Sequence, residues 1–203
     1  MKYITNKESL SDFFDENYYK SINYLDYTTR EKKYSSTAKD LLEFFKLQPE
    51  DSILDYGCSI GLLMEGYKKL GINDVYGFDI SKWAISESKK KNLNTSDSLE
   101  ILNNKSYKLT TALDVFEHMF DDNLNEILPL INTEYLLVRI PVKLEGAEDY
   151  HLEVSRRDMS HVNCKTQEDW ILFIENFGYK FQAEISTNTI YSADGCFCGY
   201  FKK

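Results

Sequence analysis

The sequence predicts an α/β fold, a three-layer sandwich with helices on both faces of a mostly parallel, seven-stranded sheet. Two observations indicate this fold. Short apolar segments alternate with segments of helical periodicity between residues 36 and 176, an alternation that is typical of parallel sheets. Two further apolar segments, 179–185 and 189–201, follow each other with no helix between them. This succession predicts one antiparallel strand near the C-terminus.

The first half of the chain contains two strand–helix units. Gly71 is placed to stop the second of three predicted helices, and Ser81 is placed to cap the third, because its hydroxyl can accept a hydrogen bond from the first helical turn. The expected elements are a helix from Ser36 to the turn at 48–51, a strand at 52–56, a helix at 62–70, a strand at 74–78 and a helix from Ser81 through Lys89.

The second half continues the alternation, although residues 92–107 are poorly patterned and give only a weak third strand. Pro141 ends the fifth strand. Glu168 stands near a capping-box position of the last helix. The expected elements are strands at 99–102, 108–115 and 134–140, helices at 123–131 and 166–176, and the two final strands at 179–185 and 189–201.

Length and composition fit one domain over residues 1–203. Hydrophobic residues make up 42% of the chain and aromatic residues 14%, which is enough for a sizeable core. Residues 1–34 are polar and rich in tyrosine, and we expect them to form a partly helical N-terminal lid. Residues 142–165 are a long polar connection, and we expect a substrate-side loop there.

The charge balance argues against some partners. The formal net charge is −9, and residues 101–150 hold 4 basic and 9 acidic side chains. Nucleic acid and an anionic membrane surface both require clustered positive charge, so neither is an expected partner. The sequence shows no signal peptide and no membrane span, which favours a cytoplasmic location.

The four cysteines do not form a disulfide framework, which favours a reduced compartment. A zinc site is conceivable, but the spacing of the candidate ligands matches no standard site, and no metal site is predicted. These candidate ligands are Cys164, Cys196, Cys198 and His161.

The strongest local signal is the glycine-rich loop from Gly57 to Gly61, and three chemistries use similar loops. A dinucleotide fingerprint fails at two positions, where Ser59 and Leu62 stand in place of glycines. A hydrolase nucleophile elbow matches literally, but such an elbow follows several strands, and here the loop follows the first one. The third interpretation is a nucleoside-binding loop preceded by an acid, Asp55.

Two carboxylates support the nucleoside interpretation. Asp55 ends the first strand and can accept a hydrogen bond from an ammonium group. Asp79 ends the second strand, 18 residues after Gly61. This is near the spacing at which an acid binds ribose hydroxyls in nucleotide-binding sheets.

Three segments, residues 53–61, 75–81 and 112–118, together resemble the signature segments of class I S-adenosylmethionine-dependent methyltransferases. The resemblance covers roughly residues 36–203. One departure is Ser59, which stands where the family usually has its middle glycine. The resemblance implies a Rossmann-like fold, S-adenosylmethionine as the cofactor and S-adenosylhomocysteine as the product.

By this resemblance, the cofactor would lie along the carboxyl ends of the strands. The residues implied are Asp55, Gly57, Cys58, Ser59 and Gly61 for the methionine part, Asp79 for both ribose hydroxyls, Ile80 against the adenine, Asp97 or Ser98 near the adenine amino group, and Asp114, Val115 and Phe116 beside the sulfonium. Asp114 has an alternative role as a helix cap beyond the fourth strand.

All three histidines of the chain, His118, His151 and His161, follow the fourth or fifth predicted strand. A histidine suits proton removal from a hydroxyl, because its pKa lies near neutrality. His118 and His161 compete for this base role, and Asp158 would orient His161 or the acceptor. Alternatively, Asp158 and His161 could ligate a divalent cation with Asp114, a cofactor that is possible but not predicted.

The implied function is methyl transfer to a sugar hydroxyl of a glycan or nucleotide-sugar. The layout around His118 and the 142–165 loop resembles small-molecule and glycan O-methyltransferases. The Pro-Pro motif of nucleic-acid amino-methyltransferases is absent after the fourth strand. The alternatives are a quinol-type small-metabolite O- or N-methyltransferase and a non-catalytic S-adenosylmethionine-binding subunit. Either a monomer or a homodimer is compatible with the sequence.

Overall fold

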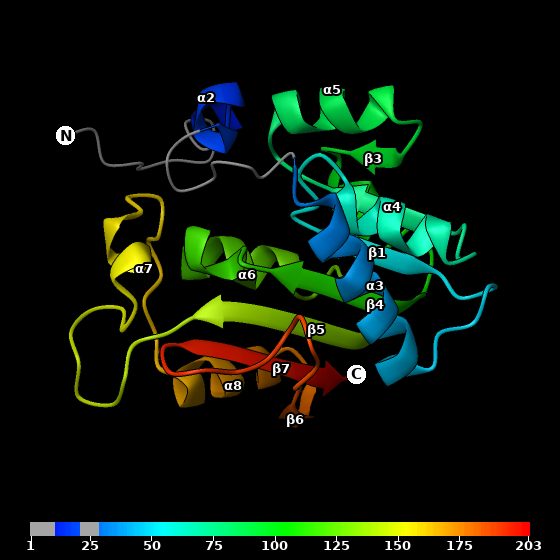
Figure 1. Ribbon diagram of the computed structural model, residues 1–203. Coiled ribbons are helices and arrows are strands. Elements are labelled where there is room, and N and C mark those ends of the chain that lie inside the picture. Colours follow the sequence, from blue (N-terminus) through cyan, green and yellow to red (C-terminus); the bar gives the residue numbers. More distant parts are fainter. Residues whose placement is uncertain (1–10, 21–28) are drawn as a thin grey trace. The chain divides into compact units, whose positions relative to one another are not determined.

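The computed structural model describes residues 11–20 and 29–203 (Figure 1). Those parts of the expected 1–34 lid that fall on residues 1–10 and 21–28 lie outside the described residues. The chain divides into two compact units, residues 1–108 (unit 1) and 109–203 (unit 2).

The seven strands of the described chain form one sheet in the order β3-β2-β1-β4-β5-β7-β6. Strands β1, β2 and β3 pair in parallel. Strand β7 is antiparallel to both of its neighbours, β5 and β6. The predicted α/β fold with one antiparallel strand near the C-terminus is therefore confirmed. In the described residues no helix is both long and apolar enough to cross a membrane.

Unit 1 contains the elements α2 (Glu16–Tyr19), α3 (Glu31–Phe45), β1 (Ile53–Tyr56), α4 (Leu62–Lys69), β2 (Val75–Phe78), α5 (Lys82–Lys90), β3 (Asn94–Ser96) and the 3₁₀ helix η2 (Leu99–Leu102). Helix α3 packs closely on α4. Gly66 permits this approach, because a Cβ there would lie 2.8 Å from the Cβ of Ala38. As predicted, the Ser81 hydroxyl caps α5 by accepting a hydrogen bond from the Ala84 amide.

Two boundaries in unit 1 differ from the prediction. Helix α3 begins at Glu31 and not at Ser36, so it takes up the end of the expected lid. The third strand is β3, whereas the apolar segment 99–102 is the 3₁₀ helix η2. Ser98 starts this helix, since its hydroxyl accepts a hydrogen bond from the Glu100 amide.

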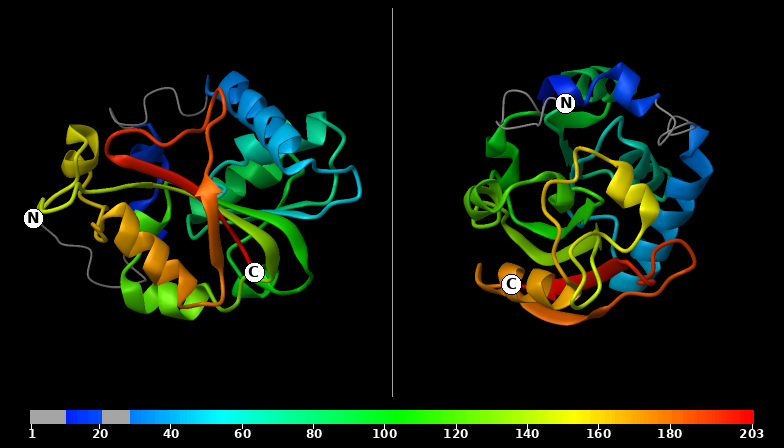
Figure 2. Two further views of the ribbon diagram at one scale, coloured as in Figure 1. Left: turned by 90° about the horizontal axis from the view of Figure 1, so that it is seen from below. Right: turned by 90° about the vertical axis from the view of Figure 1, so that its left-hand side faces the viewer.

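Strand β4 (Tyr107–Leu113) crosses from unit 1 into unit 2. The remaining elements are η3 (Phe116–His118), α6 (Asp121–Ile127), β5 (Thr133–Pro141), α7 (Glu153–Arg157), α8 (Gln167–Glu175), β6 (Lys180–Glu184) and β7 (Cys196–Lys202). Helix α8 packs against β6, and Figure 2 shows it beside the strands of unit 2.

Unit 2 corrects three expectations. The last strand begins at Cys196 and not at residue 189. The capping box of α8 joins Thr166 to Asp169 and not to Glu168. The 142–165 connection contains a short helix, α7. The largest fully buried side chains of this unit are Trp170, Tyr179, Phe116, Phe197 and Phe201.

Candidate functional site

The glycine-rich loop of unit 1 is held against the end of β2 by its backbone. The amides of Gly57 and Cys58 both donate to the Phe78 carbonyl, at 2.7 and 3.0 Å. Gly61 begins α4 with φ of +79°, and a Cβ there would lie 2.2 Å from Leu93 Cδ1. Glycine is therefore required at this position by both conformation and space.

Asp79, which follows β2, lies beside this loop. One carboxylate oxygen accepts the Ser59 amide at 2.7 Å, and the other accepts the Ser81 amide at 2.8 Å. Burial raises the pKa of Asp79 to about 6, while the two backbone amides oppose this rise. Each oxygen accepts one amide and keeps a lone pair, so the carboxylate can still accept two hydroxyl groups.

Ser59 occupies the left-handed region, with φ of +49°. Glycine adopts this conformation without steric cost, whereas an L-residue is strained by about 1–2 kcal/mol. The strained backbone directs the Ser59 amide to Asp79. The position at which this sequence departs from the family pattern is thus one where the backbone favours glycine.

Residues 11–20 cover the Asp79 carboxylate. Tyr19 is buried, and its ring stacks on Trp83 with centroids 5.2 Å apart. Burial, followed by the charge of Asp79, raises the pKa of Tyr19 well above its usual value. The Ser81 hydroxyl donates to the Phe14 carbonyl at 2.5 Å. Asp79 is consequently only 7% exposed.

The other predicted cofactor residues of unit 1 differ in burial. Asp55 is buried within β1, and Ile80 packs at the edge of the cluster that includes Tyr19. Asp97 and Ser98 are exposed and follow β3. They lie one strand from Asp79, whose amide donates to the Ser96 carbonyl at 3.2 Å.

Cys58 lies inside the loop and is buried. A Cβ at Gly77 would meet its Sγ at 2.6 Å, so the thiol fills the space that the glycine leaves. Burial raises the pKa of the thiol well above its usual value, with smaller contributions from Asp79 and Asp55. Cys58 therefore packs the loop against β2 as a neutral side chain.

In unit 2, the segment after β4 carries the three residues that were predicted to lie beside the sulfonium, Asp114, Val115 and Phe116. Asp114 has φ of +57° and accepts a hydrogen bond from Arg139 at 3.1 Å. It does not cap the next helix, because the N-cap of η3 is Val115, which has no side-chain capping bond. Phe116 is fully buried.

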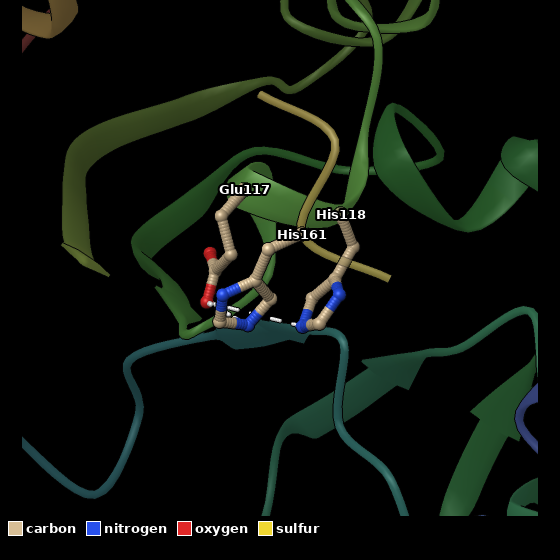
Figure 3. Close-up of side chains that lie close together, drawn as sticks. All are labelled: Glu117, His118 and His161. Carbon is tan, nitrogen blue, oxygen red and sulfur yellow. Dashed lines mark ion pairs between the residues drawn. The ribbon is translucent and has the colours of Figure 1, made fainter. Parts of the chain in front are cut away.

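Glu117, His118 and His161 form one group of side chains, here called the Glu–His–His cluster. Glu117 and His118 project from η3 and His161 from a separate segment (Figure 3). The segment is held by the Glu117 carbonyl, which accepts the amides of Val162 at 2.9 Å and Asn163 at 3.0 Å. The Nε2 atoms of both histidines lie 3.9 Å from the same Glu117 oxygen, Oε1.

Ser160 and Asp158 support this cluster. The Nδ1 atom of His118 lies 2.9 Å from the Ser160 hydroxyl oxygen and 3.2 Å from the Ser160 carbonyl oxygen. The same hydroxyl donates to Asp158 Oδ1 at 2.5 Å. The other Asp158 oxygen lies 3.8 Å from Nε2 of His161.

Burial shifts the pKa values of all three side chains in the Glu–His–His cluster. Burial, and then the charge of Asp114, raises the pKa of Glu117 well above its usual value. Burial, and then the neighbouring His161, lowers the pKa of His118 to about 4. Burial also lowers the pKa of His161, although Asp158 opposes this effect. Both imidazoles are consequently neutral at pH 7.

The structure thus unites the two predicted base candidates and places Asp158 beside His161. Asp114 pairs with Arg139 and does not join the group that could hold a cation, whose described members are Glu117, His118 and His161. His151 is exposed and also lies outside it. Glu117 stood in the predicted signature segment 112–118, directly before His118, but no role was predicted for it.

Comparison with known proteins identifies one family. Residues 28–183 match a family model described as a methyltransferase domain. A curated relative, the ribosomal protein L11 methyltransferase of Paraburkholderia phytofirmans, is 49% identical over 43 residues. That match covers 21% of this chain and 14% of the relative.

Solved structures agree with this chain in fold. The magnesium protoporphyrin IX methyltransferase of Synechocystis PCC 6803, with bound SAM, is 14% identical, with a TM-score of 0.66 and 100% of both chains covered. A SAM-dependent methyltransferase of Archaeoglobus fulgidus is 20% identical, with a TM-score of 0.63 and coverage of 88% and 100%. Mitomycin 7-O-methyltransferase is 12% identical, with a TM-score of 0.69 and coverage of 98% and 61%.

Proposed function

The chain belongs to the methyltransferase-domain family of class I S-adenosylmethionine-dependent enzymes, and we propose that it methylates a hydroxyl oxygen of a small polar acceptor. The acceptor in this proposal is a sugar of a glycan or nucleotide-sugar. The family match spans residues 28–183 and therefore includes parts of both units. The observation that carries the choice of an oxygen acceptor is the Glu–His–His cluster.

Unit 1 supplies the cofactor contacts in this proposal. The two oxygens of Asp79 accept the ribose hydroxyls, because each keeps a free lone pair. The glycine-rich loop and Asp55 hold the methionine part, and Ile80 contacts the adenine. The assignment of Asp97 or Ser98 to the adenine amino group agrees with their place at the end of β3. The roles of Asp114, Val115 and Phe116 stay predictions.

Unit 2 supplies the proton acceptor. The acceptor oxygen attacks the methyl carbon, the carbon–sulfur bond breaks as the carbon–oxygen bond forms, and the hydroxyl proton leaves to a base. The products are a methyl ether and S-adenosylhomocysteine. A neutral imidazole can take this proton. His161 is the base in this proposal, because the Asp158 carboxylate lies 3.8 Å from its Nε2 atom.

A less polar acceptor is the second candidate. Within the 142–165 connection, Leu144, Val154 and Met159 are about half exposed, at 45%, 57% and 54%. Such side chains would suit a quinol-type small metabolite. The connection also carries exposed Glu148, Asp149 and Arg157, which favour a hydroxyl-rich acceptor.

The test is transfer of labelled methyl groups to sugar nucleotides and oligosaccharides, quinols, peptides and nucleic acid. We expect label in a carbohydrate. His161→Ala should lower kcat by about 10²–10⁴-fold without changing the dissociation constant of S-adenosylmethionine. Glu168→Gln, an exposed change on α8, is the control. Label only in a quinol would support the second candidate, and tight cofactor binding without any transfer would favour a non-catalytic subunit.

A further inference from the structure

The carboxylate of Glu117 is buried without a hydrogen-bond donor. Its side chain is 1% exposed, and neither carboxylate oxygen accepts a hydrogen bond from the described residues. Both histidine Nε2 atoms lie 3.9 Å from Oε1, which is too far for a hydrogen bond. Burying a carboxylate in this way is costly unless a proton or a cation accompanies it.

The contacts of His118 with Ser160 indicate which ring nitrogen carries the proton. A carbonyl oxygen can only accept, so the contact with the Ser160 carbonyl requires the proton of His118 to be on Nδ1. The Ser160 hydroxyl donates to Asp158 and accepts from the same Nδ1–H. With the proton on Nδ1, Nε2 is the ring nitrogen that can coordinate a metal ion, and it lies 3.9 Å from Oε1 of Glu117.

A cation between these atoms would supply the partner that the Glu117 carboxylate lacks among the described residues. The three candidate ligand atoms, one from each residue, lie within 4.8 Å of one another. Ligands bound at about 2.1 Å to one ion lie roughly 3.0–3.4 Å apart, so the 3.9 Å separations need to shorten by about 0.5–0.9 Å. The Ser160 contact on Nδ1 of His118 is the outer-shell hydrogen bond that metal-bound histidines usually make.

We propose that Glu117, His118 and His161 bind one divalent transition-metal ion through a carboxylate oxygen and two imidazole nitrogens. Two imidazoles with one carboxylate favour Mn²⁺, Fe²⁺ or Zn²⁺ over Mg²⁺, which prefers oxygen ligands. Asp158 lies next to His161 and adds negative charge that favours a cation. Three protein ligands leave positions open for water and for an acceptor oxygen.

The role of this ion rests on the proposed function, although its binding does not. A hydroxyl coordinated to the ion loses its proton more readily, because the positive charge stabilises the alkoxide. When the ion is bound, His161 is one of its ligands and no longer the base assigned above, and water takes the proton. The acceptor oxygen is also held in place for attack on the methyl carbon.

The first test is metal binding by the whole chain after treatment with a chelator. Calorimetry with Mn²⁺ should give one site per chain, and Co²⁺ should give a visible absorption spectrum typical of nitrogen and oxygen ligands. Glu117→Gln and His161→Ala should weaken Mn²⁺ binding by more than the roughly 10–100-fold that outer-shell changes cause. Glu168→Gln and His151→Asn, two exposed positions, should bind Mn²⁺ as the wild type does.

Circular dichroism of each variant separates loss of a ligand from loss of folding. The proposal is wrong if the wild type binds no stoichiometric Mn²⁺, Zn²⁺ or Co²⁺, or if Glu117→Gln folds and binds as tightly as the wild type. Equal affinity for Mg²⁺ would overturn the transition-metal assignment. Stoichiometric metal binding by a chain that transfers no methyl group would uphold the site and refute the proposed function alone.

Discussion

At the scale of single residues, Asp79, the proposed ribose ligand, shows how much of a site a sequence can predict. Its place after β2 was predictable from the sequence, because the second strand and the glycine-rich loop were both recognisable. The amides of Ser59 and Ser81, which fix its orientation, come from two turns that a sequence pattern does not place together. The residue was therefore predictable, and its hydrogen bonds were not.

The pKa of Asp79 predicts how cofactor affinity depends on pH. Burial raises this pKa to about 6, so the carboxylate is ionised at pH 8 and largely protonated at pH 5. Protonation removes an acceptor for the ribose diol. The affinity for S-adenosylmethionine should thus fall as the pH drops through 6, by up to about tenfold per unit, as calorimetry can measure.

A control distinguishes Asp79 from other titrating groups. Asp79→Ala should lose most cofactor binding at every pH, and any affinity that remains should no longer fall near pH 6. Unchanged affinity of this variant at pH 8 would refute the ribose assignment.

Ser59 leads to a prediction about stability. Its φ of +49° strains an L-residue, so Ser59→Gly should raise the free energy of unfolding by about 0.5–1 kcal/mol, after allowance for the greater chain entropy of glycine. Ser36→Gly within α3 should instead lower it by about 0.5 kcal/mol, since glycine is a poor helix former. Denaturant unfolding measures the free energy of unfolding of both variants. A lower value for Ser59→Gly would show that Ser59 is not strained.

At the scale of elements, the structure shows which strands a hydrophobic pattern can predict. Strands β1 and β2 are short and apolar, and both were predicted within two residues. Strand β3 has the sequence Asn-Thr-Ser and is defined by its pairing with β2, so no apolar pattern marks it. In η2, the apolar side chains of Ile101 and Leu102 are buried, although this segment is not a strand. Hydrophobicity therefore located the core but not the edge of the sheet.

The Glu–His–His cluster was only partly predictable for a related reason. His118 and His161 were candidates separately, but their meeting depends on backbone bonds from Val162 and Asn163 to the Glu117 carbonyl. Those bonds join segments more than forty residues apart. Because they are made by the main chain, the spacing of side chains in the sequence does not reveal them. No role was predicted for Glu117, because a single sequence does not distinguish a buried acid from an exposed one.

Helix α2 leads to a prediction about cofactor entry, on the proposal that Asp79 binds the ribose. Tyr19 stacks on Trp83 and lies over Asp79, which is only 7% exposed. Opening of residues 11–20 should limit association. Tyr19→Ala removes a ring contact worth about 1 kcal/mol, so it should speed the association of S-adenosylmethionine about fivefold. Stopped-flow tryptophan fluorescence measures this rate. Tyr191→Ala, an exposed tyrosine in unit 2, should leave the rate unchanged, and an unchanged rate for Tyr19→Ala would refute a lid.

At the scale of the whole molecule, the mostly parallel sheet with one antiparallel strand follows from general rules, whereas the division into units does not. Alternation of strands and helices fixes a parallel sheet, and two consecutive strands at the end fix the antiparallel member β7. The boundary between the units falls inside β4, where composition and hydrophobicity do not change. The loop glycines and both carboxylates of the nucleoside interpretation fall in unit 1, and the Glu–His–His cluster falls in unit 2.

This division predicts that the two proposed ligands protect different amides from hydrogen exchange. A ligand at 100 times its dissociation constant stabilises the state that binds it by about 2.7 kcal/mol, which slows exchange through opening of that state about 100-fold. S-adenosylmethionine should protect residues 53–61 and 75–81, and Mn²⁺ should protect residues 117–118 and 158–163. Asp79→Ala should abolish only the first effect and Glu117→Gln only the second. Protection of 158–163 by Mn²⁺ in the Glu117→Gln variant would place the ion elsewhere, since Glu117 supplies the carboxylate on which the proposed site depends.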